Sequence, residues 1–170
     1  MSAARFFLGF RGRTGRARYW LYLAIALPSL VALVIVSYLY ALSIPGAYEN
    51  GGPTPLPSGP FGIAAAIAWA MALFVLFAGY FAATVKRLHD RGKSAWWLFV
   101  FVFLPNAIYA FGEIAVQTGF NSSAIFLIRF VAAGMFVWAF IELGCLRGTR
   151  GNNRFGPDPL AGKAIAAPPG

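Results

Sequence analysis

Charged residues, above all acidic ones, are scarce in this sequence. Its 170 residues include five aspartates and glutamates, and charged residues of either sign make up 11 % of the chain. Soluble domains carry about 25 % charged residues, whereas 59 % of the residues here are apolar. A water-soluble fold of this length could not bury so much apolar surface, so the composition predicts an integral membrane protein.

Cysteine and histidine are nearly absent, with one residue of each, Cys145 and His89. A single cysteine excludes an intrachain disulfide, and the sequence holds no group of thiols and imidazoles that could complete a zinc site. It also lacks the phosphate-binding loop, the zinc-protease helix motif and the nucleophile-elbow motif of hydrolases. We therefore expect no metal and no cofactor, and the sequence announces none of the reaction classes that such motifs reveal.

Long apolar runs, in contrast, occupy most of the chain. About 20 apolar residues are enough for a helix to cross the hydrocarbon core of a bilayer. We predict an all-α fold, a bundle of four transmembrane helices, with spans at about residues 19–44, 61–85, 95–116 and 124–146. They form a single membrane domain over residues 1–160, and the low-complexity end over residues 161–170 is predicted to be disordered.

The basic residues indicate an orientation for these spans. The formal net charge is +9, and all lysines and arginines except Arg129 fall in the amino-terminal segment, the loop between the second and third spans, and the carboxyl-terminal tail. Because lysine and arginine mark cytoplasmic segments, we place both termini in the cytoplasm. The basic residues stand in short clusters at the ends of apolar runs, which favours lipid phosphates over nucleic acid as their partners.

The stretch Lys86 to Trp97, K-R-L-H-D-R-G-K-S-A-W-W, allows three interpretations. The simplest is that the second helix extends into the cytoplasm and ends at Gly92 in the left-handed conformation, with cations where the helix dipole favours them. A second is that its arginines bind lipid phosphate or another anion. A third makes His89 a general base, although Asp90 lies about 100° away around the helix and is poorly placed to orient it.

Three ionisable residues lie inside the predicted spans: Glu113, Arg129 and Glu142. Glu113 and Arg129 are at matching depths in neighbouring spans, so we predict an intramembrane ion pair, which would explain both residues without any transport role. Glu142 lies near the cytoplasmic end of the fourth span, where it could pair with Arg87 or Arg91 or extend its carboxylate to the interface.

Three stretches together resemble a known family. They are F-L-G-F-R-G-R-T-G-R-A-R-Y-W at residues 7–20, K-R-L-H-D-R-G-K-S-A-W-W at residues 86–97, and G-N-N-R-F-G-P-D-P at residues 151–159. In this order they are similar to the domain of unknown function 805 family, and the likeness extends from about Phe6 to Pro159. The resemblance implies a small multi-pass protein of the bacterial cytoplasmic (inner) membrane, and it supplies neither a reaction nor a catalytic residue.

With the predicted topology, the three stretches emerge on the cytoplasmic side and form a polar rim, in which Asp90 and Asp158 are placed to bridge arginines from neighbouring segments. Our leading hypothesis is a non-enzymatic protein whose rim binds anionic phospholipid headgroups or a protein partner. The candidate rim residues are Arg11, Arg13, Arg16, Arg87, His89, Asp90, Arg91, Trp96, Trp97, Arg154 and Asp158.

Two other classes of function stay open, and a homo-oligomer or a membrane-protein partner is compatible with each. One is a small-solute transporter or channel component, with Pro105, Asn106, Glu113, Arg129 and Glu142 along its path. The other is a lipid-modifying enzyme, which requires a headgroup-sized pocket where His89, a carboxylate and at least two arginines converge.

Overall fold

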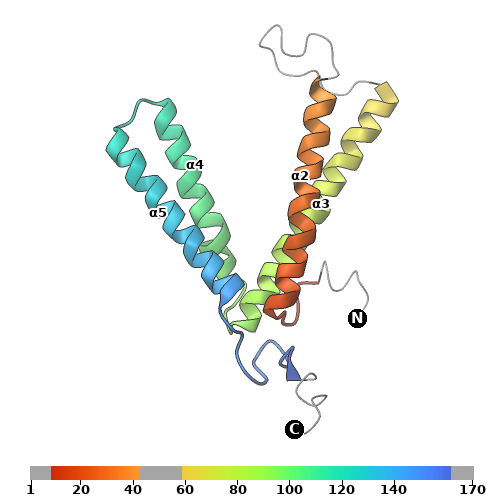
Figure 1. The fold of residues 1–170 in the computed structure, drawn as a ribbon, viewed down its shortest axis with the longest axis vertical. Coiled ribbons are helices and arrows are strands. Elements are labelled where there is room, and N and C mark those ends of the chain that lie inside the picture. Colours follow the sequence, from red (N-terminus) through yellow and green to blue (C-terminus); the bar gives the residue numbers. More distant parts are fainter. Residues whose placement is uncertain (1–8, 43–58, 162–170) are drawn as a thin grey trace. The chain divides into compact units, whose positions relative to one another are not determined.

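The computed structural model describes residues 9–42 and 59–161, and this part of the chain is helical (Figure 1). The helices are α2 (Arg16–Leu42), α3 (Gly59–Asp90), the π-helical turn η1 (Phe99–Phe103), α4 (Leu104–Gln117), α5 (Ser122–Phe140) and the π-helical turn η2 (Ile141–Cys145). The described residues form no strand, and their one β-bridge joins Asn153 to Gly156 in the carboxyl-terminal segment.

Within residues 9–42 and 59–161, four helical stretches are long and apolar enough to cross a membrane. They are Arg16–Tyr40, Gly62–Asp90, Phe99–Gln117 and Ser122–Cys145. The predicted all-α fold with four membrane-spanning helices is therefore confirmed, whereas the cytoplasmic placement of the termini stays a prediction. The second helix is longer than the predicted span 61–85, because α3 continues from Val85 to Asp90. Its last turn carries part of the basic cluster.

Two compact units make up the chain, one of residues 1–20 and 81–170 and the other of residues 21–80. The prediction of a single domain over residues 1–160 stays a prediction, and of residues 161–170, predicted to be disordered, residues 162–170 fall outside the described residues. In the second unit, α2 and α3 meet where the Tyr22 hydroxyl donates to Leu76 O at 2.6 Å. A Cβ atom at Gly79 would lie 2.7 Å from that hydroxyl oxygen, so the ring requires glycine there.

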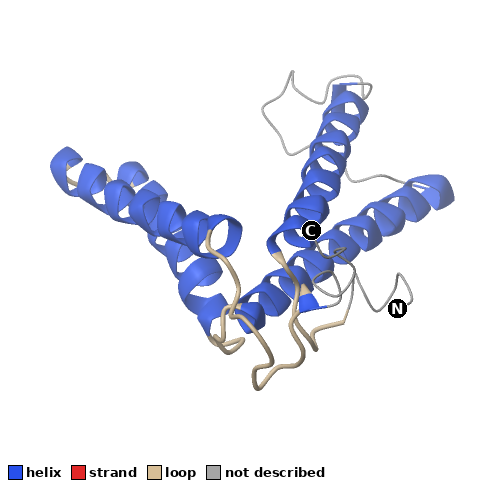
Figure 2. Cartoon of the chain, turned by 60° about the horizontal axis from the view of Figure 1, so that its bottom comes forward, coloured by secondary structure: helices blue, strands red, loops and turns tan. Residues whose placement is uncertain are grey.

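In the first unit, α4 and α5 form an antiparallel hairpin and pack side by side along their length (Figures 1 and 2). Asn121 caps α5, because its Oδ1 accepts hydrogen bonds from the N–H groups of Ser123 at 2.9 Å and Ala124 at 3.3 Å. A close approach at Gly112, where a Cβ would lie 3.3 Å from Ile128, keeps the two helices in contact.

A π-helical turn interrupts each arm of this hairpin near the end opposite the Asn121 turn. The η1 turn directly precedes α4, whose second residue is Pro105; proline has no N–H to donate and is tolerated in the first turn of an α-helix. A π-turn thus stands immediately before the turn that contains Pro105. Asn106 donates its side-chain N–H to Val102 O at 2.7 Å, one turn back in the same arm.

Candidate functional site: a basic junction

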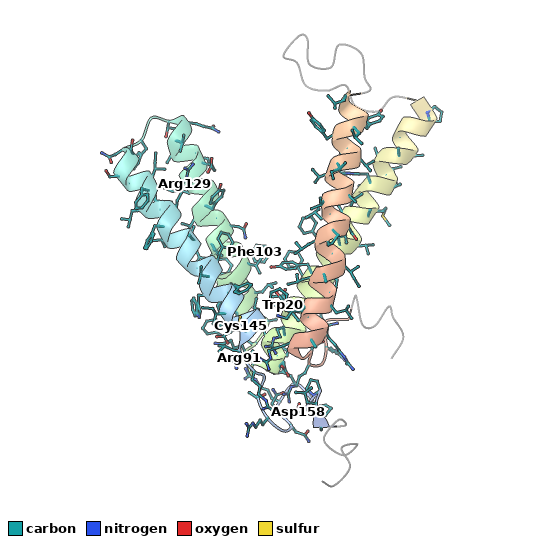
Figure 3. All side chains as sticks on the ribbon, in the orientation of Figure 1. Trp20, Arg91, Phe103, Arg129, Cys145 and Asp158 are labelled. Atoms are coloured by element: carbon teal, nitrogen blue, oxygen red, sulfur yellow. The ribbon has the colours of Figure 1, made fainter. Side chains whose placement is uncertain are left out.

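The three motif stretches meet at one end of the first unit. We call the region in which residues 11–20, 86–97 and 141–160 contact one another the basic junction. Its loops gather where α3 ends and η2 ends (Figure 2), and Trp20, Arg91 and Cys145 lie close together there, with Asp158 below them in the view of Figure 3. The start of α2, the end of α3 and the segment that follows α5 thus form one site.

Asp90, the last residue of α3, is held by two arginines. Its Oδ1 lies 3.1 Å from Arg13 Nη2 and its Oδ2 lies 2.5 Å from Arg87 Nη1. The exposed fractions of the three side chains are 1 % for Arg13, 0 % for Arg87 and 4 % for Asp90. Gly148 packs directly on the carboxylate, since a Cβ there would lie 2.0 Å from Asp90 Oδ2. Asp90 therefore bridges arginines from two segments, Arg13 and Arg87, as predicted from the sequence.

The carboxyl-terminal end of η2, which continues the α5 arm, is capped by donors from the other two stretches. The last carbonyls of a helix have no partner within the helix, and cations are favoured beside them. Here the carbonyls of residues 143–147 each accept a side-chain N–H. The pairs are Arg87 Nε to Leu143 O (2.7 Å), Trp20 Nε1 to Gly144 O (3.0 Å), Arg16 Nη1 to Cys145 O (2.9 Å), Arg87 Nη2 to Leu146 O, and Arg91 Nη1 to Arg147 O.

Residues 147–160, which we call the strap, cap the end of α3 in return. Thr149 donates to Asp90 O from its backbone N–H at 2.8 Å and from its hydroxyl at 3.0 Å, and Asn153 Nδ2 donates to His89 O at 3.0 Å. Arg13 holds the strap through its carbonyls at Thr149 (2.5 Å), Gly151 (2.6 Å) and Gly156 (3.2 Å). The helix itself ends as predicted, with Gly92 at φ +73°. The segment that follows η2 thus caps the end of α3, and side chains near the end of α3 help to cap η2.

His89 takes part in packing between these segments. Its ring stacks on Phe155 with centroids 4.0 Å apart, and its Nδ1 donates to Gly12 O at 3.2 Å. The carboxylate of Asp90 is directed to the arginines instead of the imidazole. The geometry that the enzyme hypothesis requires, an imidazole oriented by a carboxylate, is therefore not the one that His89 and Asp90 adopt.

Glu142, in η2, lies in the same junction. Its Oε1 is 3.1 Å from Arg91 Nε and 3.6 Å from Lys93 Nζ, and 8 % of its side chain is exposed. Of the two partners considered from the sequence, Arg91 is the one it contacts, because Arg87 is directed to Asp90. Lys93 also lies 4.1 Å from the centre of the Trp97 ring, whereas Trp96 is 76 % exposed.

The candidate rim residues therefore separate into two classes. Arg13 and Arg87 are buried and bonded to protein groups, so they build the junction instead of facing a ligand. Six arginines of the described residues are exposed at the junction: Arg11, Arg16, Arg18, Arg147, Arg150 and Arg154. The predicted anion-binding residues Arg11, Arg16 and Arg154 belong to this second class.

Asp158 differs from Asp90 in its partners. Its two oxygens accept the backbone N–H groups of Gly151 at 3.0 Å and Leu160 at 2.9 Å. These hydrogen bonds, from Leu160 first and then from Gly151, lower the pKa of the Asp158 carboxyl. Within the described residues no guanidinium or ammonium group lies within ion-pairing distance of it, so the expected arginine bridge forms at Asp90 and not at Asp158.

Arg129 lies outside the junction, toward the far end of the α4–α5 hairpin (Figure 3), and Glu113 is paired with it there. Arg129 Nη2 is 2.8 Å from Glu113 Oε1, and 44 % of each side chain is exposed. The two residues predicted from their depths to pair are thus in contact, and the contact is on the surface of the hairpin.

Several junction residues are not among the candidate rim residues named from the sequence: Trp20, Thr149, Asn153 and Phe155. Thr149 and Asn153 are short polar residues in a glycine-rich segment, and such residues commonly bond backbone groups near helix ends. That signal could have suggested capping. Nothing local indicates which helix they cap, because α3 is about sixty residues away in sequence.

Known proteins resemble this chain along most of its length. A sequence profile of the family described as "Protein of unknown function (DUF805)" matches residues 7–157. Inner membrane protein YhaH of Escherichia coli strain K12 is 27 % identical over 154 residues, which cover 90 % of this chain and 88 % of YhaH. Uncharacterized protein YiiR of the same strain is 28 % identical over 158 residues, which cover 93 % of this chain and 90 % of YiiR. No solved structure gives a significant match.

Proposed function

We propose, from the premise that this chain belongs to the DUF805 family and is a multi-pass protein of the bacterial inner membrane, that its basic junction binds anionic lipid headgroups on the cytoplasmic side. The binding groups are the six exposed arginines of the junction. The buried residues Arg13, Arg87 and Asp90 hold the three segments together so that these arginines share one surface. Function then consists of binding without turnover.

The arginines of the junction fall into an ion-paired group and an exposed group, and this difference supports the proposal. Asp90 and Glu142 together with Arg13, Arg87, Arg91 and Lys93 form ion pairs within the junction. The exposed arginines have no comparable number of carboxylates beside them, since Asp158 is the one further acidic residue of the junction. An uncompensated set of exposed arginines attracts anions, and each basic residue near a membrane surface contributes about 1 kcal/mol to the binding of acidic lipid.

The position of these arginines along the helices favours lipid over a soluble anion. Arg16 and Arg18 lie in the first turn of α2, and Arg147 follows η2 by two residues. Both helices are long enough to span the bilayer, so their ends lie at the level of the headgroups. The exposed ring of Trp96 belongs to the same region, and indole rings prefer the membrane interface.

The test compares Arg18→Gln/Arg150→Gln with the wild-type protein. Both residues are exposed, so their loss leaves the buried contacts intact. We expect apparent affinity for phosphatidylglycerol, measured by native mass spectrometry of detergent-purified protein titrated with lipid, to fall about 30-fold for the pair. The charge-neutral variant Glu113→Gln/Arg129→Gln is the matched control. Unchanged selectivity for phosphatidylglycerol over phosphatidylcholine in the first variant would overturn the proposal.

The orientation can be tested with the natural cysteine, because Cys145 is exposed at the junction. A membrane-impermeant maleimide is expected to label Cys145 after permeabilisation of the cells and not before. Ser122→Cys in a Cys145→Ser background, at the opposite end of the hairpin, is expected to be labelled in intact cells. The reverse pattern would place the junction outside the cytoplasm.

A further inference from the structure

A small cavity lies within the basic junction, between the start of α2 and the strap. Its volume is about 30 Å³, whereas a cavity of about 10–15 Å³ is enough to hold one water molecule. The space therefore suits a group of the size of one ammonium. The lining residues are Gly15, Arg16, Asp90, Arg147, Gly148, Thr149, Asp158, Pro159 and Leu160.

The charges in the cavity wall are of two kinds. Arg16 and Arg147 are exposed. Arg16 uses one nitrogen to bond Cys145 O, and the guanidinium of Arg147 makes no hydrogen bond or ion pair to any described residue. Asp90 is already neutralised by its two buried arginines. Asp158 is then the carboxylate in the wall that has no cation within ion-pairing distance among the described residues, although Arg13 and Arg147 lie near enough to favour its charged form.

The hydrogen-bonding capacity of Asp158 is only partly used. An ionised carboxylate offers about four acceptor positions, and the backbone N–H groups of Gly151 and Leu160 occupy two of them. An aspartate carboxyl is ionised at neutral pH, and these two bonds, which lower the pKa of Asp158, stabilise its charged form further. The cavity thus presents guanidinium groups and an acceptor-rich carboxylate, which together match a ligand that carries both a phosphate and an N–H-bearing cation.

We propose that this cavity binds the headgroup of phosphatidylethanolamine, with its primary ammonium against Asp158 and its phosphate between Arg16 and Arg147 at the mouth. Guanidinium groups bind phosphate through paired N–H donors, and an ammonium supplies three N–H donors to a carboxylate. Phosphatidylcholine has the same phosphate and net charge, but its nitrogen carries three methyl groups and no N–H. The assignment rests on the headgroup binding proposed above and adds a lipid class to it.

The experiment measures binding of phosphatidylethanolamine and phosphatidylcholine with matched acyl chains to the full-length protein by native mass spectrometry. We expect phosphatidylethanolamine to bind about tenfold more tightly, as a charge-assisted hydrogen bond allows. Asp158→Asn is expected to reduce this preference to less than about twofold. Arg147→Gln is expected to weaken the binding of both lipids by the same factor. Because the side chain of Arg147 is exposed, the substitution should leave the fold intact.

The outcomes that would contradict this inference differ from those that would contradict the proposed binding of anionic lipid. Equal binding of the two zwitterionic lipids by the wild-type protein overturns the inference, while a retained preference for phosphatidylglycerol leaves the wider proposal intact. An undiminished preference in Asp158→Asn overturns the role of this carboxylate. Displacement of the lipid by soluble glycerophosphoethanolamine at equal concentration overturns the assignment to a membrane lipid in favour of a soluble phosphodiester.

Discussion

Two groups of ion pairs, at opposite ends of the α4–α5 hairpin, face different surroundings. At the basic junction, Asp90 and its arginines are at most 4 % exposed and are bonded to three segments of the chain. At the far end, Glu113 and Arg129 are each 44 % exposed and join only two neighbouring helices. An ion pair inside a network of buried hydrogen bonds determines how segments assemble, whereas a half-exposed pair mainly neutralises two charges locally.

The largest effect is expected from Asp90→Asn. The substitution leaves Arg13 and Arg87 buried without a counter-charge, and loss of one partner from a buried pair costs about 3–5 kcal/mol. We expect the free energy of unfolding, measured by denaturant titration in detergent micelles, to fall by about this amount. Asp158→Asn is the control: it removes the same charge where no cation lies within ion-pairing distance among the described residues, and it loses one acceptor for a backbone N–H, so a loss of about 1 kcal/mol is expected. A loss below about 1 kcal/mol in Asp90→Asn would contradict the importance of the network.

A smaller effect is expected from Gly148→Ala. The added methyl group would lie 2.0 Å from Asp90 Oδ2, so either the strap or the carboxylate must move. Overpacking of this kind costs about 1–3 kcal/mol, read as a lower midpoint of thermal unfolding. Gly134→Ala in α5 is the matched control, since nothing lies within 4 Å of the added atom. Equal midpoints for the two variants would show that the strap does not pack on Asp90.

The smallest effect is expected from Glu113→Gln/Arg129→Gln. Exposed ion pairs contribute about 0–1 kcal/mol, so the double variant should unfold close to the wild-type midpoint. Arg129→Gln alone should be less stable than the double variant, because it leaves Glu113 without its partner. A destabilisation of the double variant as large as that of Asp90→Asn would remove the distinction between the two ends.

The residues of the junction could be found from the sequence, but their partners could not. Composition and motif spacing identified Arg13, Arg87, Asp90 and Asp158 as polar residues that stand out beside apolar runs. They did not separate the buried arginines from the exposed ones, because an arginine in a short loop has the same local pattern in either case. Arg13 contacts Gly151 and Gly156, which are more than 130 residues away, and no local rule relates such positions.

The same limit applies to the ends of the helices. Gly92 was predicted to end the second helix, and it does, since a left-handed glycine is a local feature. The capping of residues 143–147 by side chains from α2 and α3 was not predicted. Those carbonyls need partners wherever a helix ends, but only the contacts between segments determine that Arg16, Trp20 and Arg87 supply them.

The sequence by itself determined that this chain crosses a membrane four times as helices, because apolar length and the need to pair backbone groups in lipid allow little else. It also determined where the charges stand along the chain. Only the tertiary structure decided which arginines are buried with Asp90 and which face outward. The reason is physical: burial of a guanidinium depends on carboxylate and carbonyl groups brought from distant segments, and their arrival depends on how the helices pack.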